Sequence, residues 1–337
     1  MAVLHGQKAD KVPLMLLNFM PAAAEAGFTM DEYRSSAKNM AKAQIDFARK
    51  YGMDGIWLEV DTCMEAGAIG AEVELRRDAP AAITGPAADN IKELIDMMTP
   101  DRLLKYDRIK IMLEAAHLIK KEVGGEILLR GNCDQMAFSL AMLCYGMENF
   151  LADLTDEDLE EDIQTLISRA FEVHLEFHRL MKQTGADITS FGDSSCGPDV
   201  IGPAMYLKYS KPYHQKLQKA VSEELGMMTV CHICGNLDRI IEDVLDVGFA
   251  GIEIDYKTNI PRAAELMRGK TVEFGPIDPS GMFYFAKPEE MTREVNRVLD
   301  CFGGRGIVLG AGCAIPKGAP EENFRAFAKA ARSYTIR

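Results

Sequence analysis

The feature that most constrains the fold is a regular alternation of short apolar, β-branched runs with longer segments of helical composition. Eight such runs occur along the chain: Val12–Leu17, Gly55–Val60, Glu126–Gly131, Asp187–Phe191, Met228–Cys234, Gly251–Tyr256, Thr271–Ile277 and Gly306–Cys313. Repeated strand–helix alternation indicates parallel strands with helical crossovers, and the count of eight favours closure into a (β/α)8 barrel. We therefore predict an α/β protein: a single TIM-barrel domain over residues 1–337, with N-terminal and loop elaborations.

The segments between these runs are predicted to be helices that cross from one strand to the next. The clearest are Thr99–Glu122, Thr155–Gln183, Pro203–Leu225, Leu237–Val247 and Pro288–Cys301. An open, doubly wound sheet is the alternative architecture, but neither G-x-G-x-x-G nor G-x-x-x-x-G-K-[ST] follows any of the strands. Pro80–Asn90, rich in Ala, Pro and Gly, is interpreted as a long loop or a small insertion.

Charge and cysteine content narrow the function. The chain has 38 Lys and Arg against 51 Asp and Glu, a net charge of −13, which argues against a nucleic-acid partner. No apolar run approaches the roughly 20 residues that span a bilayer, and the N-terminus lacks the apolar stretch of a signal peptide. We expect a cytoplasmic protein with no membrane partner, in which the eight Cys are core residues, nucleophiles or metal ligands rather than disulfides.

In a barrel the chemistry lies at the carboxyl ends of the strands. Polar and sulfur-containing side chains are concentrated at the ends of the predicted strands. The candidate substrate-binding residues among them are Asn18, Glu59, Cys133, Met136 and Asp193. The alternative for each is a role in packing, a helix cap or an ion pair.

The most informative motif is a His-x-Cys pair at the end of one strand. Because strand side chains alternate between faces, His232 and Cys234 point to one side while Cys231 and Ile233 point to the other. Cys313, at the end of the last predicted strand, is the best third ligand, since strand ends face a common mouth. The result would be a Cys2His zinc site with an open fourth position, the catalytic pattern. The alternative is two buried thiols and a core histidine.

A carboxylate follows on the next strand. Glu253 and Asp255 share a face, and Asp255 lies nearer the predicted mouth. It is a candidate fourth ligand that leaves when substrate binds, or a partner that orients His232. The alternative is a helix cap or a salt bridge.

Three stretches of the chain resemble a known family. They are His232-Ile233-Cys234-Gly235-Asn236, Gly312-Cys313-Ala314-Ile315-Pro316 with Pro320-Glu321-Glu322-Asn323, and Ala9-Asp10-Lys11-Val12-Pro13. Together they are similar to the methylcobamide:coenzyme M methyltransferases of the uroporphyrinogen decarboxylase superfamily, a TIM-barrel group. The resemblance implies that His232, Cys234 and Cys313 bind Zn2+, and that Asp255 stands where the family has a glutamate as fourth ligand.

The resemblance also implies a reaction. A thiol activated by zinc would take a methyl group from a corrinoid (cobalamin), which a separate protein carries because this chain lacks Asp-x-His-x-x-Gly. Departures at the pocket, such as Gly192-Asp193-Ser194, keep an O-demethylase acting on an aromatic methyl ether as an alternative. A non-catalytic zinc-stabilised binding protein is a third hypothesis. Uroporphyrinogen decarboxylation is disfavoured because the Arg-Gln-Ala-Gly-Arg motif is missing and the first arginine is Arg34. The sequence leaves open whether the chain forms a homo-oligomer.

Overall fold

The computed structural model of the protein describes all of residues 1–337 and contains a seven-stranded parallel sheet in the order β1-β4-β5-β6-β7-β8-β9. The strands are β1 (Gly55–Leu58), β4 (Leu128–Gln135), β5 (Ile188–Gly192), β6 (Thr229–Ile233), β7 (Gly251–Ile254), β8 (Val272–Ile277) and β9 (Ile307–Ala311). Each neighbouring pair is parallel. Seven of the eight runs that were predicted to be strands therefore form the sheet, with ends shifted by a few residues.

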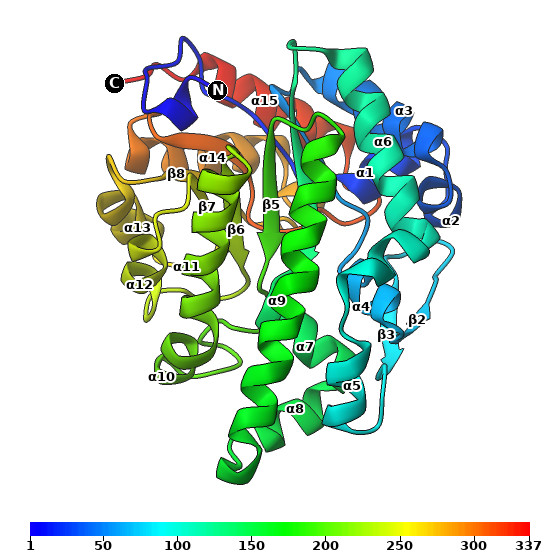
Figure 1. The fold of residues 1–337 in the computed structure, drawn as a ribbon. Helices are drawn as coiled ribbons and strands as arrows, with labels where there is room; N and C mark the ends of the chain where they lie inside the picture. Colours follow the sequence, from blue (N-terminus) through cyan, green and yellow to red (C-terminus); the bar gives the residue numbers. More distant parts are fainter.

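Helices cover the outside of this sheet (Figure 1). They are α1 (Phe19–Glu25), α2 (Met30–Arg34), α3 (Ala37–Tyr51), α4 (Met64–Ile69), α5 (Ile91–Met97), α6 (Asp107–Val123), α7 (Ala137–Tyr145), α8 (Met147–Asp153), α9 (Glu160–Gln183), α10 (Pro203–Met205), α11 (Lys211–Lys219), α12 (Ile241–Asp246), α13 (Ile260–Met267), α14 (Pro288–Phe302) and α15 (Glu321–Ser333). Figure 1 places both chain termini at one end of the molecule, and the arrow of β5 points to the other. None of these helices is long and apolar enough to cross a membrane.

The prediction of a regular strand over Val12–Leu17 is wrong, although this segment lies where the first strand of the barrel was expected. It forms a single bridge, between Leu14 and Leu309 of β9. Leu309 N–H donates to Pro13 O (2.8 Å), and on the other side Asp54 N–H donates to Leu14 O (2.9 Å). The segment thus lies between β9 and β1 and closes the barrel. Pro13 has no N–H to donate, which limits the ladder that this segment can form.

Closure requires a glycine on the facing strand. A Cβ atom at Gly310 would lie 2.2 Å from the backbone oxygen of Met15, closer than atoms can approach. We therefore expect Gly310→Ala to push the closing segment away from β9 and to lower the free energy of unfolding by about 1 to 3 kcal/mol.

Urea unfolding measures this effect. Gly202→Ala is the matched control, because a Cβ atom there would meet nothing within 4 Å. Equal stability of the two variants would contradict the closing role that we give to Gly310.

The other differences from the sequence-based predictions lie in the loops. An antiparallel hairpin of β2 (Glu72–Glu74) and β3 (Ala82–Gly85) forms a small second sheet, part of it within the stretch interpreted as a loop or insertion. The helix predicted to start at Thr99 instead divides at Tyr106, between the 3-10 turn Pro100–Lys105 and α6.

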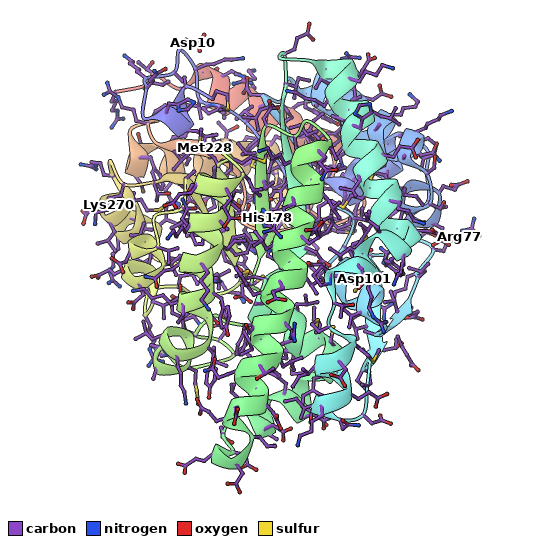
Figure 2. The ribbon with its side chains drawn as sticks, viewed as in Figure 1. Asp10, Arg77, Asp101, His178, Met228 and Lys270 are labelled. Carbon is purple, nitrogen blue, oxygen red and sulfur yellow. The ribbon has the colours of Figure 1, made fainter.

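The core is continuous. One cluster of 105 buried residues joins the sheet to its helices. His178, labelled in Figure 2, is an example: it lies on α9, is fully buried, and its Nδ1 is 2.9 Å from Thr189 Oγ1 on β5. Dense packing of this kind fixes the strand ends that carry the candidate site.

Candidate metal centre

The structure brings the His-x-Cys pair and the distant cysteine together. His232 on β6, Cys234 just after it and Cys313 just after β9 place one nitrogen and two sulfur atoms within 4.8 Å of one another. His232 Nε2 lies 3.1 Å from Cys234 Sγ. Zinc bonds of about 2.0 Å to nitrogen and about 2.3 Å to sulfur separate tetrahedral ligands by roughly 3.5 to 4 Å. The donor set therefore fits zinc, with a small separation of His232 Nε2 from Cys234 Sγ.

A close approach of two strand ends positions Cys313. A Cβ atom at Gly312 would lie 2.9 Å from the backbone oxygen of Ile254 and 3.0 Å from the backbone nitrogen of Tyr256. Only glycine lets the end of β9 pass this close to the end of β7. The glycine before Cys313 is thus part of what builds the site.

Cys234 and His232 form a thiolate–imidazolium pair, and the Cys313 thiol donates a hydrogen bond to the thiolate. A hydrogen bond from the Cys313 thiol, together with the neighbouring His232, lowers the pKa of Cys234 to about 3. The same contact raises the pKa of the Cys313 thiol. Burial disfavours a charged imidazole, but the Cys234 thiolate and Glu253 outweigh it and raise the pKa of His232 to about 10. A half-buried site that stabilises a thiolate in this way is suited to a soft cation.

The two carboxylates of β7 take different roles. Glu253 Oε1 is 3.4 Å from His232 Nδ1, on the opposite side of the ring from Cys234. Asp255 accepts hydrogen bonds from the backbone N–H groups of Gly235 (3.1 Å) and Lys257 (3.2 Å), and its oxygens lie outside the three-ligand cluster. Glu253 is therefore the partner that faces His232. Strand alternation placed it on the same face as Asp255, but Asp255 was the residue predicted to act at the site.

Glu59 and Asn18 are buried among the strand ends. Glu59, just past β1, is 7% exposed, and the charge of His232 acts on it. Burial, reinforced by the nearby carboxylates Asp134 and Glu253, raises the pKa of Glu59 to about 8. Asn18 is 5% exposed and directly precedes α1.

The structure does not bring Cys133, Met136 or Asp193 into the cluster. All three are fully buried. The Asp193 carboxylate is already engaged: one oxygen accepts from the Ser139 backbone N–H (3.0 Å) and hydroxyl (2.6 Å), and the other lies 2.9 Å from His214 Nε2. These partners belong to helices α7 and α11, so the carboxylate joins helices to the sheet.

Sequence reasoning missed one further buried group, the Arg130 guanidinium. It lies on β4, is 1% exposed, and its Nη1 is 2.9 Å from Glu253 Oε2. The signal was an arginine that directly follows the apolar run Ile127-Leu128-Leu129 of a predicted strand. A charge at such a position requires a buried partner.

Comparison with known proteins places the chain among enzymes. Methylcobamide:CoM methyltransferase MtbA of Methanosarcina mazei is 25% identical over 340 residues, covering 98% of this chain and 96% of the relative. Methylcobamide:CoM methyltransferase MtaA of Methanosarcina barkeri is 25% identical over 346 residues, covering 99% and 96%. Uroporphyrinogen decarboxylases also match, at 22 to 24% identity. The relatives' names agree with the prediction of an enzyme.

Solved structures support the fold. A methyltransferase from Methanosarcina mazei superposes with a TM-score of 0.88 at 23% identity, covering 98% of this chain and 96% of that one. This likeness confirms the predicted α/β barrel architecture. Residues 1–334 match the uroporphyrinogen decarboxylase (URO-D) family. The match spans nearly the whole chain, as the motifs around His232 and Cys313 had indicated, and the protein belongs to the URO-D family.

Proposed function

We propose that the protein is a zinc-dependent methyltransferase that moves a methyl group between a separate corrinoid protein and a small thiol. The observation that carries this proposal is the convergence of His232, Cys234 and Cys313, whose ligand atoms lie within 4.8 Å. The names of the methylcobamide:CoM methyltransferase relatives support it. The corrinoid is brought by the partner, and both proteins are proposed to act in the cytoplasm.

His232 Nε2 and the sulfur atoms of Cys234 and Cys313 would hold the ion. When bound, zinc supplies a Lewis acid that keeps a coordinated thiol deprotonated near neutral pH. Three protein ligands leave a position for that thiol. We propose Asp255 as the replaceable fourth ligand, which would first have to release the backbone N–H groups of Gly235 and Lys257.

The chain's own residues then orient and shield the reaction. The substrate thiolate attacks the methyl carbon of the methylated corrinoid, the new carbon–sulfur bond forms, and the cobalt–carbon electron pair stays on cobalt. Asn18 and Glu59 are buried at the strand ends and are proposed substrate contacts, and Glu59 interacts electrostatically with His232. Cys133, Met136 and Asp193 would act on substrate only indirectly, through the packing of the helices.

A second candidate is an O-demethylase, and one observation favours it. The raised pKa of Glu59, about 8, keeps this carboxyl protonated at neutral pH. A neutral carboxylic acid that interacts with His232 could donate a proton to the oxygen that leaves when an aromatic methyl ether gives its methyl group to cob(I)amide. A thiol acceptor needs no such acid.

The experiment that tests the proposal has two stages. Metal analysis of the purified chain is expected to find about one zinc ion and no cobalamin. The chain is then mixed with a methylated corrinoid protein and a thiol such as 2-mercaptoethanesulfonate while the cobalt spectrum is followed. Thiol-dependent loss of the cobalt–carbon band supports the first candidate. Methylation of cob(I)amide by methoxylated aromatics alone supports the second, and inactivity with both substrates would overturn the methyltransferase proposal.

A further inference from the structure

An arginine–glutamate pair lies inside the barrel, beside the candidate metal centre. Arg130 on β4 and Glu253 on β7 are 1% and 0% exposed, and Arg130 Nη1 is 2.9 Å from Glu253 Oε2. Strands β5 and β6 separate β4 from β7 in the sheet. A contact over that separation can form only across the concave side of the sheet, so the pair spans the barrel interior.

Two aromatic rings hold the guanidinium. Its central carbon lies 3.5 Å from the ring centroid of Trp57 and 5.1 Å from that of Phe274. The Arg130 Nε and Nη2 atoms are buried and have no hydrogen-bond partner, so the two rings and Glu253 are what hold this cation in place. Stacking suits the flat guanidinium, whereas an ammonium group would lose the contact.

Glu253 connects this cation to the imidazole. His232 Nδ1 lies 3.4 Å from Glu253 Oε1 and 3.3 Å from the Glu253 backbone oxygen, while Nε2 faces Cys234 Sγ at 3.1 Å. The Glu253 backbone oxygen accepts from Nδ1, so Nε2, which faces the cysteine sulfur, is the nitrogen that would bind an ion once it gives up its proton. A continuous set of contacts therefore runs from Trp57 through Arg130 and Glu253 to the cluster.

We propose that Arg130 is a positioning residue of the metal centre. It holds Glu253 where the backbone oxygen accepts from His232 Nδ1 (3.3 Å) and the carboxylate Oε1 lies 3.4 Å from the same nitrogen, which keeps Nε2 turned toward the ion site. This inference rests on the proposed function, because it requires that His232, Cys234 and Cys313 bind zinc. Groups that orient a ligating histidine in this way commonly change metal affinity by roughly 10- to 100-fold.

Zinc affinity of the purified full-length protein tests the inference. The dissociation constant is measured by competition with a chromophoric chelator for the wild type, Arg130→Met, Arg130→Lys and Glu253→Gln. We expect Arg130→Met and Glu253→Gln to bind zinc roughly 10- to 100-fold more weakly, with Arg130→Lys in between because it restores the charge without the stack. In the cobalt(II)-substituted protein, the visible ligand-field bands are expected to shift in the same variants.

A matched control separates positioning from general stability. Arg108 on α6 forms another buried ion pair, with Asp61, and neither residue forms an ion pair with Glu253 or His232. Arg108→Met is expected to lower the melting temperature while leaving zinc affinity and the cobalt spectrum unchanged.

The outcomes are distinguishable. Wild-type zinc affinity and an unchanged cobalt spectrum in Arg130→Met and Glu253→Gln would overturn the positioning role alone. If Arg130→Met does not fold, Glu253→Gln and Arg130→Lys decide by the same two measurements. A wild-type protein that binds no zinc would overturn the proposed function as well.

Discussion

Cys234→Ala and Cys313→Ala are each expected to abolish methyl transfer and to weaken zinc binding by more than roughly 100-fold. Each substitution removes one of three proposed ligands, and even groups that only orient ligands cost up to about 100-fold. Cys234→Ala also removes the thiolate that faces His232, and Cys313→Ala removes a hydrogen bond that stabilises this thiolate. Zinc per chain after dialysis and chelator competition measure the effect.

Cys231, the residue directly before His232, provides the matched control. Cys231 is fully buried but lies on the opposite face of β6 from His232 and outside the cluster. Cys231→Ala should reduce stability modestly through a small cavity and leave zinc bound. Retention of zinc by both Cys234→Ala and Cys313→Ala would refute the metal assignment. So would loss of zinc from Cys231→Ala with the two other cysteines intact.

The second large effect concerns stability. Asp193→Ala is expected to lower the free energy of unfolding by about 3 to 5 kcal/mol, because it leaves His214 and Ser139 buried without their partner. For a chain of this size the melting temperature should fall by roughly 4 to 7 °C. Asp193→Asn should be milder, since its amide can still accept from Ser139. Calorimetry and urea unfolding give both values.

The Asp193 substitutions also test whether this carboxylate binds substrate or stabilises the fold. The sequence suggested a substrate contact, whereas the carboxylate in the structure is engaged by two helices. If Asp193 only stabilises the fold, the folded fraction of Asp193→Asn is expected to keep the wild-type KM and zinc content. An unchanged stability combined with a raised KM would instead identify a substrate ligand.

Most of the fold follows from local pattern, and the exceptions have physical causes. Buried parallel strands such as β6 and β9 read as continuous apolar runs, which is why they could be located. The segment Val12–Leu17 has the same composition but lies at the closure, where it forms one bridge. The strand Glu72–Glu74 was missed because it is mostly exposed and carries two charges in three residues.

The candidate site was likewise predicted only where a local pattern determines it. Alternation along one strand sufficed to group His232 with Cys234 and to set Cys231 apart, since that rule is local. The partnership of Arg130 with Glu253 depends on how far the sheet curves between β4 and β7. Curvature is set by the packing of the whole barrel, and no short motif encodes it.

The closing segment has a consequence for biosynthesis. Leu14 pairs with Leu309, and Arg332 of α15 donates to the backbone oxygens of Val12 and Gly52, so the barrel joins residues from opposite ends of the sequence. During translation the edges of the Val12–Leu17 segment and of β8 stay unpaired until β9 has left the ribosome. Open edges of this kind recruit other chains. The nascent protein therefore depends on rapid completion, or on a chaperone, to avoid aggregation before its first and last segments meet.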